Sequence, residues 1–306
     1  MIETVQYQNL QWHHISDATE DDYRFLLETY HFHPLDIEDC RGTNQRPKID
    51  EYDNYYFLIL HFPYFDKGNK FVRIKEVKIF WGKDFIITIG KSHWVVKKVF
   101  ESINEGLADG DEATIKNLKT SDLLLYRLLD RLMAETNTLI TRIGAEVDLI
   151  NYDIFSKKAR SIIEQISITR RNIILLNTTF KPQLRLFHQF ESGGIKGFSG
   201  EEMEDYWGDI LDQYQKMFDS VEDYGELIAG LSQTFDSLQA NRSNEIMTVL
   251  TLFSSTMLPL TVITGMYGMN VGLPLQNHPQ AFWFILLFML LATLALLFFF
   301  KRRNLR

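Results

Sequence analysis

The sequence predicts an α+β protein that ends in a membrane hairpin. It places an N-terminal α/β domain before a coiled-coil-like stalk helix, which continues into the first of two C-terminal transmembrane helices. Three observations lead to this prediction. Strand-like runs occur within residues 1–118, apolar residues recur every seven positions after residue 199, and residues 246–300 carry no charged side chain.

The uncharged region is long enough for two membrane crossings. It spans 55 positions without Asp, Glu, Lys or Arg, although these residues make up 24% of the chain. Residues 246–267 and 281–300 form apolar runs of 22 and 20 residues. Each run can cross a ~30 Å hydrocarbon core as a helix. A buried hairpin in a soluble core is the alternative, which the all-round apolar character of Leu286–Phe300, apart from Thr293, disfavours.

Positive charges predict the orientation of the hairpin. Arg242 precedes the first span, and the turn-forming residues 269–280 between the spans contain no Lys or Arg. A basic tail, residues 301–306, follows the second span. The positive-inside rule therefore predicts that both termini are cytoplasmic and that only the loop is external.

The N-terminal domain, residues 1–118, mixes strand and helix signals and carries no signal-peptide core. The predicted strands are 55–60, 77–81 and 84–89, and the predicted helices are 21–30 and 94–103. A helical hairpin is expected over 119–198. Its helices should cover 121–152 and 162–180, and Pro182 and Gly193–Gly194 should close it.

The stalk, residues 199–268, shows the most regular pattern. Ser199 and Glu202 fit a capping box, and no proline follows before Pro259, so one helix of about 100 Å can run through the first span. The two heptad sets are Trp207, Tyr214, Val221, Ile228 and Phe235, and Ile210, Met217, Tyr224, Leu231 and Leu238.

Composition and motifs argue against several classes of function. The net charge of −8 argues against nucleic acid as a partner, and Cys40, the single cysteine, excludes an intramolecular disulfide. No nucleophile, phosphate loop or dinucleotide motif is recognisable, which predicts that the protein is not an enzyme and has no organic cofactor. Paired histidines at 13–14 and 31 and 33 are expected to be packing or surface residues.

The first span carries seven hydroxyl side chains, whereas the second has only Thr293. One face of the first span is small or hydroxyl-bearing, with apolar breaks, and copies of it around an axis would line a narrow pore. Hydroxyls that merely bond backbone carbonyls are the alternative for each single residue. The face comprises Asn244, Met247, Thr251, Ser254, Leu258, Thr261, Gly265 and Gly268.

The end of this span resembles a known family. Tyr267-Gly268-Met269-Asn270 is similar to the Y-G-M-N signature of the CorA magnesium-transporter family, and residues 241–261 are similar to its first span. Residues 33–39 and 46–48 resemble segments of its cytoplasmic domain.

This resemblance implies a homopentameric channel in the plasma membrane, the inner membrane of a bacterium. It implies Mg²⁺ as the transported ion, with Co²⁺ or Ni²⁺ as surrogates, and a selectivity filter of Gly268, Met269 and Asn270. The implied pore-lining residues are Asn244, Met247, Leu250, Thr251, Ser254, Leu258, Thr261 and Gly265.

The stalk is acidic: residues 201–245 hold twelve acids and two bases, a charge of −10, so the rest of the chain is near +2. A solvated helix face is the ordinary explanation. The resemblance implies that Asp209 and Asp212 bind regulatory Mg²⁺ between subunits and thereby gate the channel.

Two alternatives remain open. The external loop lacks the acid common in magnesium-carrying members, which resembles the zinc-transporting ZntB branch and suggests Zn²⁺ as cargo. A protein of another class, a cytoplasmic sensor or scaffold tethered by the hairpin, would not depend on the hydroxyls of the first span.

Overall fold

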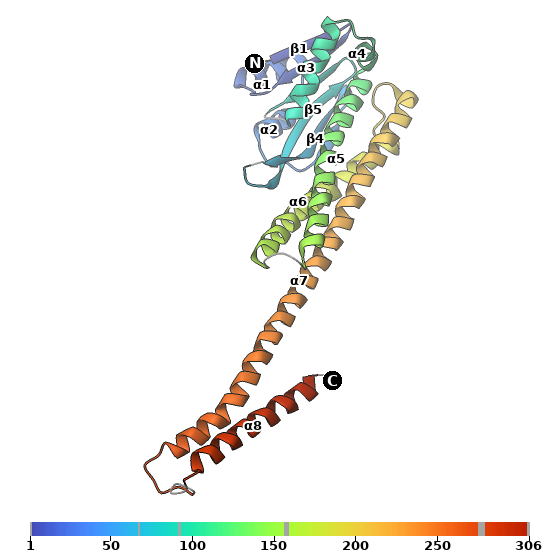
Figure 1. The fold of residues 1–306 in the computed structure, drawn as a ribbon. Helices are drawn as coiled ribbons and strands as arrows, with labels where there is room; N and C mark the ends of the chain where they lie inside the picture. Colours follow the sequence, from blue (N-terminus) through green and yellow to red (C-terminus); the bar gives the residue numbers. More distant parts are fainter. Residues whose placement is uncertain (1, 67, 91–92, 156–158, 275–278, 305–306) are drawn as a thin grey trace. The chain divides into compact units, whose positions relative to one another are not determined.

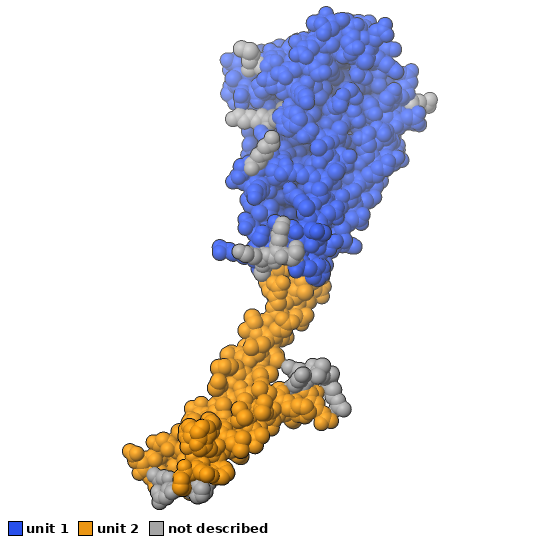
Figure 2. All heavy atoms as spheres, viewed as in Figure 1, with its two compact units in different colours: residues 1–232 blue, residues 233–306 orange. Residues whose placement is uncertain are grey.

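The computed structural model describes residues 2–66, 68–90, 93–155, 159–274 and 279–304. The chain divides into two compact units, Met1–Ser232 and Gln233–Arg306, coloured separately in Figure 2. The longest helix, α7 (Glu204–Tyr267), contributes residues to both units.

The first unit is built on a six-stranded sheet in the order β1-β2-β6-β5-β4-β3 (Figure 1). All neighbouring strands are antiparallel except β2 and β6, which are parallel. The three predicted strands are confirmed, and two of them extend to twelve residues. The strands are β1 (Ile2–Tyr7), β2 (Leu10–Ile15), β3 (Lys48–Glu51), β4 (Tyr55–Asp66), β5 (Phe71–Gly82) and β6 (Phe85–Ile89).

Helices cover both faces of the sheet. On one face, α1 (Glu20–Tyr30) and α2 (Pro34–Arg41) share a core with Phe57 and Phe80. On the other, α3 (Trp94–Ala108), α5 (Ser121–Asp153) and α6 (Ala159–Glu191) contact the strands, and α4 (Glu112–Asn117) lies beside α3 and α5. Phe57 and Leu58 are adjacent and both fully buried, because successive side chains of a strand point to opposite faces.

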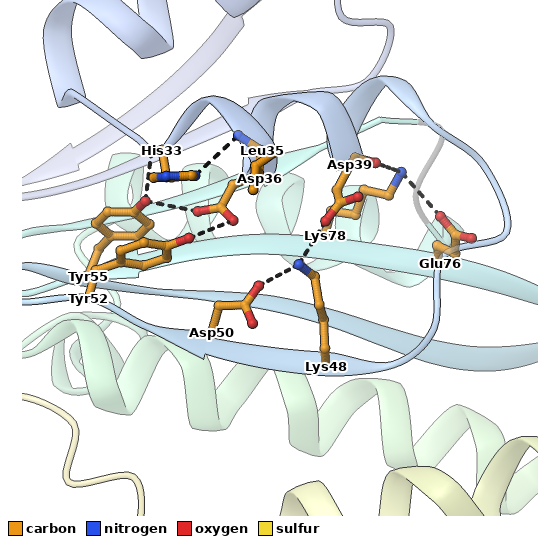
Figure 3. Close-up of polar contacts among 10 residues, drawn as sticks. All are labelled: His33, Leu35, Asp36, Asp39, Lys48, Asp50, Tyr52, Tyr55, Glu76 and Lys78. Carbon is orange, nitrogen blue, oxygen red and sulfur yellow. Dashed lines mark hydrogen bonds and ion pairs between the residues drawn. The ribbon is translucent and has the colours of Figure 1, made fainter.

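A buried polar network holds α2 on the sheet (Figure 3). Asp36 accepts hydrogen bonds from the hydroxyls of Tyr52, at 3.0 Å, and Tyr55, at 2.8 Å. Lys78, nearly fully buried, donates to the Asp39 and Gly42 carbonyls at the end of the helix, which suits a cation at a helix C-terminus.

The same network joins the two N-terminal segments that resemble the transporter family. Lys48 forms an ion pair with Asp39 at 2.7 Å and a second one with Asp50, so residues 33–39 and 46–48 meet in space (Figure 3). Their contacts therefore position α2 against this face of the sheet.

Within the first unit, α7 packs on α6 through its heptad residues. The ring of Tyr214 lies 4.4 Å from that of Phe187, and the ring of Trp207 lies 4.8 Å from that of Phe190. The first heptad set is buried throughout, and the second set is buried or half-buried. The predicted stalk helix is therefore confirmed, and within this unit its apolar seam faces the unit's own helices.

Two predicted helix ends are wrong. Pro182 lies inside α6, which runs to Glu191, because the lost backbone bond is offset by burial of Phe187 and Phe190 in the following turns. The Ser199 capping box does not begin an α-helix. A 3₁₀ turn, Gly200–Met203, comes first, and the Ser199 amide instead donates to the buried carboxylate of Asp122 at 2.6 Å.

The second unit contains the end of α7 and α8 (Ala281–Asn304). Both helices are long and apolar enough to cross a membrane, and almost none of the apolar stretch of either is buried. An unburied apolar helix of this length is stable in lipid and not in water. The two C-terminal spans predicted from the sequence agree with this arrangement.

Candidate ion pathway

The predicted pore-lining face of α7 lies away from α8. Half-buried or buried residues of the span recur at Leu252, Thr256, Leu260 and Ile263, which is one face of a helix. In α8 the corresponding half-buried positions are Ile285, Met289, Thr293 and Leu296. The helices α7 and α8 face each other through these two sides.

The small and hydroxyl-bearing face occupies the opposite side of α7. At 100° per residue, Thr251, Ser254 and Thr261 lie about 140–160° from Thr256, and all three are exposed in the single chain. The remaining stripe positions are equally exposed: Asn244, Met247, Leu258, Gly265 and Gly268. The single chain thus leaves this face uncovered.

Several hydroxyls bond to their own helix. Thr248, Thr261 and Thr264 donate to carbonyls four residues earlier at 2.8–3.0 Å, and Thr256 does the same at 3.0 Å. A hydroxyl that donates to a carbonyl still presents oxygen lone pairs to a neighbouring water. These bonds therefore satisfy the donors in an apolar medium and leave acceptors available.

The Y-G-M-N segment forms the end of the first span. The α-helix ends at Tyr267, and the amides of Gly268 and Met269 close the last turn on the carbonyls of Thr264, at 3.0 Å, and Met266, at 3.2 Å. A Cβ atom on Gly268 would lie only 3.3 Å from the Thr264 carbonyl oxygen, which favours glycine there. Asn270 follows, exposed, beyond the turn.

Tyr267 connects this turn to the loop through a hydrogen bond. Its hydroxyl donates to the Pro274 carbonyl at 3.4 Å and so links the helix end to the loop that follows. The rest of the loop, residues 275–278, lies outside the described residues.

The inner end of the span is apolar and uncovered. Ile246, Met247, Val249, Leu250 and Phe253 are each more than half exposed in the single chain. Exposed apolar side chains on every side of a helix require lipid or neighbouring protein. Met247 and Leu250 are therefore available as the predicted inner constriction.

Asp209 and Asp212 lie one turn apart on the exposed side of α7. Asp209 accepts hydrogen bonds from the Tyr126 hydroxyl of α5, at 3.0 Å, and from Gln213, at 2.7 Å. Burial, together with this bond to Asp209, raises the pKa of Tyr126 to about 12. Tyr126 was not among the predicted site residues, because nothing in the sequence links positions 83 apart.

Asp209 and Asp212 supply some, but not all, of the ligands that a site for a hard cation needs. Carboxylate oxygens suit Mg²⁺, which keeps several waters and needs few protein ligands. Among the described residues, no group of three or more His, Cys, Asp or Glu side chains is arranged to hold a metal ion. The histidine pairs have structural roles: His33 caps α2, and His13 and His14 bond to Thr4 and Thr88.

Known proteins resemble this chain in sequence and in fold. The family model of the CorA-like Mg²⁺ transporter protein matches residues 7–302. The cobalt/magnesium transport protein CorA of Thermotoga maritima is 26% identical over 256 residues, which cover 84% of this chain and 70% of that protein.

Solved transporter structures share the fold, as two of them illustrate. The complete CorA magnesium transporter of Methanocaldococcus jannaschii superposes with a TM-score of 0.80 at 18% identity, covering 97% of this chain and 92% of that one. The ZntB cytoplasmic domain of Vibrio parahaemolyticus gives 0.60 at 15% identity, covering 78% and 90%. With the family model matching nearly its whole length, the chain belongs to the CorA-like Mg²⁺ transporter family, whose members move divalent cations across membranes.

Proposed function

We propose that the protein is a Mg²⁺ channel formed by five copies of the chain, with α7 lining the pore and α8 facing lipid. The observation that carries this proposal is the position of the small and hydroxyl-bearing stripe, on the side of α7 opposite the α8 contact. If α8 lies outside, the stripe faces the centre. One copy cannot enclose a pore, so the proposal requires assembly around an axis.

Asn270 is the proposed entrance ligand. With Gly268 and Met269 it would form a ring of neutral oxygens at the outer mouth. Mg²⁺ loses its water reluctantly, so amide and carbonyl oxygens that contact its hydration shell let it enter and leave, whereas a charged cage would retain it. Thr261 and Asn244 would form polar rings deeper in the pore.

The topology follows from the charges that flank the spans. By the positive-inside rule, Arg242 and the basic tail favour a cytoplasmic position for both termini, and the loop between the spans carries no Lys or Arg. The proposed location is a plasma membrane, with the first unit in the cytoplasm.

Asp209 and Asp212 are the proposed regulatory ligands. Their exposed carboxylates, with a neighbouring copy supplying further oxygens, would bind cytoplasmic Mg²⁺ and hold the channel closed. The double variant Asp209→Ala, Asp212→Ala should conduct at internal Mg²⁺ concentrations that close the wild type. Equal closure of both proteins would count against this role.

A Zn²⁺ transporter is the second candidate. The described part of the external loop has no acidic side chain, and neither do residues 275–278 in the sequence. An uncharged mouth concentrates cations weakly, which argues against fast Mg²⁺ uptake.

Ion flux into liposomes tests both candidates. Purified protein should admit Mg²⁺ faster than Zn²⁺, and Asn270→Ala should lower Mg²⁺ entry by about tenfold, since one lost hydrogen bond to the hydrated ion costs ~1–2 kcal/mol. Thr293→Val, on the α8 side of the hairpin, is the matched control and should conduct normally. Absence of flux for both ions would overturn the channel, and Zn²⁺ flux driven by a proton gradient would select the second candidate.

A further inference from the structure

A polar cleft lies between three helices of the first unit. The helices α3, α4 and α5 meet at one end of this unit (Figure 1), and they enclose a cleft of about 340 Å³. Clefts of roughly 300–1,000 Å³ are the size in which proteins hold small organic ligands. The residues that line this cleft belong to α3, α4 and α5, so it lies apart from the proposed pore and from Asp209 and Asp212.

One wall of the cleft is a row of side chains on α3. Residues four positions apart lie on one face of a helix, and Trp94, Lys98 and Ser102 have this spacing. Trp94 is 48% exposed, and the ammonium of Lys98 lies 5.6 Å from the centre of its ring. Val95 and Val99 are buried and give the cleft an apolar floor. This wall therefore offers an aromatic face beside a positive charge.

A second wall is a row on α5 that carries two arginines. Arg127, Arg131 and Glu135 follow the same four-residue spacing. Arg127 forms an ion pair with Asp130 of its own helix, at 3.2 Å. Arg131 is exposed and, like Lys98, has no ion-pair partner among the described residues. Two of the three cations in the cleft are therefore available to a ligand.

The charge of the cleft favours an anion. Its described lining residues include three bases and one acid, whereas the chain as a whole has a net charge of −8, so the excess of positive charge is local. Ammonium and guanidinium groups bind phosphate oxygens through charge-assisted hydrogen bonds, and a guanidinium can form two parallel ones. The exposed face of Trp94 adds a surface on which a flat ring can stack.

We propose that this cleft binds a nucleoside triphosphate. Lys98, Arg127 and Arg131 hold the phosphates, and the ring of Trp94 stacks on the base. Stacking on an aromatic side chain is a common way for proteins to hold a nucleic-acid base. The carboxylate of Glu135 accepts hydrogen bonds from the ribose hydroxyls, which gives the one acid of the cleft a role. The site goes beyond the proposed transport function, because it shares no residue with the proposed pore.

Equilibrium dialysis of the full-length protein in detergent, against radiolabelled ATP, tests the site. The buffer contains EDTA, because phosphate oxygens bind Mg²⁺ and attachment through a metal must be excluded. We expect saturable binding of one ATP per chain. Lys98→Gln and Arg131→Gln should each weaken ATP binding about tenfold, since each removes a charge-assisted hydrogen bond.

Lys97→Gln is the matched control. Lys97 precedes Lys98 in the chain, but it pairs with Glu101 at 3.7 Å and lies outside the cleft. This variant should bind ATP as the wild type does. Equal weakening by Lys97→Gln and Lys98→Gln would mean that ATP is attracted by general surface charge, and would overturn the site.

Two competitors separate a nucleotide from a plain phosphate. Inorganic triphosphate carries the charge without the ring, and adenosine carries the ring without the charge. ATP should bind at least about tenfold more tightly than either, and Trp94→Ala should weaken ATP binding about tenfold while leaving triphosphate binding unchanged. Triphosphate that binds as tightly as ATP would overturn the nucleotide as the ligand.

Mg²⁺ flux into liposomes, measured with the same preparations, separates this site from the proposed function. A wild type that conducts Mg²⁺ and shows no saturable ATP binding overturns the site and leaves the channel standing. ATP binding with the expected response of the variants, in a protein that conducts no ion, supports the site and overturns the channel. Thermal unfolding at the wild-type temperature confirms that each variant is folded.

Discussion

At the scale of single residues, buried polar side chains connect the sheet to the helices that lead to the span. Asp122 at the start of α5 accepts hydrogen bonds from the Trp81 indole of β5, at 3.0 Å, and from the amide of Phe198, at 3.0 Å. One carboxylate thus joins a strand, a helix and the turn that precedes α7. His93 has a similar role, because its ring accepts from the Val95 amide and contacts the Pro63 carbonyl.

The buried His93 predicts a loss of stability in acid. Burial lowers its pKa from 6.5 to about 4, so the folded protein binds a proton there less readily than the unfolded chain. The free energy of unfolding is unaffected by this histidine above pH 6.5 and decreases as the pH falls toward 4. At pH 5 the decrease is about 2 kcal/mol. Urea unfolding of the full-length protein in detergent, at pH 7.5 and pH 5, measures it.

His93→Asn is the matched control for this prediction. Asparagine keeps a side-chain acceptor for the first turn of α3 but does not titrate. Between pH 7.5 and pH 5, the free energy of unfolding of the variant should fall by about 2 kcal/mol less than that of the wild type. An identical loss in both proteins would assign the acid sensitivity to other groups, such as His13 and His14.

The sequence could identify residues whose role depends on local pattern. Gly268 to Asn270 end an apolar run, and the heptad positions repeat over five heptads, so both were recognisable without a structure. Asp122 and Tyr126 were not, because their partners lie 41 to 83 positions away and no periodicity marks them. The predicted site residues themselves remain predictions about an assembled pore.

At the scale of elements, the helices longer than ten residues were predictable, α1 and α3 among them, whereas the shorter α2 and α4 were not. The strands β1, β2 and β3 were missed because they are short and polar, and β2 buries His13 and His14 through bonds made to other elements. Helix α2 was missed because its stability comes from the Asp36 and Lys78 network more than from an apolar face.

The packing of α5 on α7 depends on a glycine. A Cβ atom at Gly144 would overlap the hydroxyl and ring of Tyr224, so the two helices approach closely there. Gly144→Ala should destabilise the protein by about 1–3 kcal/mol, since the extra methyl group forces the ring or the helix to move. Thermal unfolding followed by tryptophan fluorescence measures the loss.

Two further variants make the Gly144 prediction specific. Gly208→Ala, where no atom lies within 4 Å of the new Cβ, should instead gain about 0.5–1 kcal/mol from helix propensity. Tyr224→Ala should remove most of the penalty from Gly144→Ala. A penalty that persists without the tyrosine ring would place the conflict elsewhere.

At the scale of the whole molecule, a single chain leaves three surfaces unsatisfied. The apolar sides of the two spans lack a cover, and the small and hydroxyl-bearing face of the first span is exposed. The carboxylates along the outer side of α7, such as Asp212 and Glu226, are exposed as well. In the proposed assembly, lipid would cover the apolar sides and copies of the same chain would enclose the other two surfaces. Charge balance along the sequence was enough to reveal the acidic stalk.

The neutral external loop gives the last prediction. Gly272 has no atom within 4 Å of an added Cβ, so a side chain fits there without rearrangement. In an assembled pore, Gly272→Asp would place a ring of negative charge near the mouth and raise the local Mg²⁺ concentration. The Mg²⁺ concentration for half-maximal flux should fall about two- to fivefold at low ionic strength. The effect should vanish near 1 M salt, where the screening length is about 3 Å.

Gly272→Asn separates charge from size in this experiment. It has nearly the same shape as the aspartate variant without its charge, so it should leave the half-maximal concentration unchanged. A similar fall in both variants would mean that the loop conformation, and not its charge, limits entry. A fall for Zn²⁺ in Gly272→Asp with none for Mg²⁺ would instead mean that Mg²⁺ does not pass this mouth, and would favour the zinc-transporting alternative.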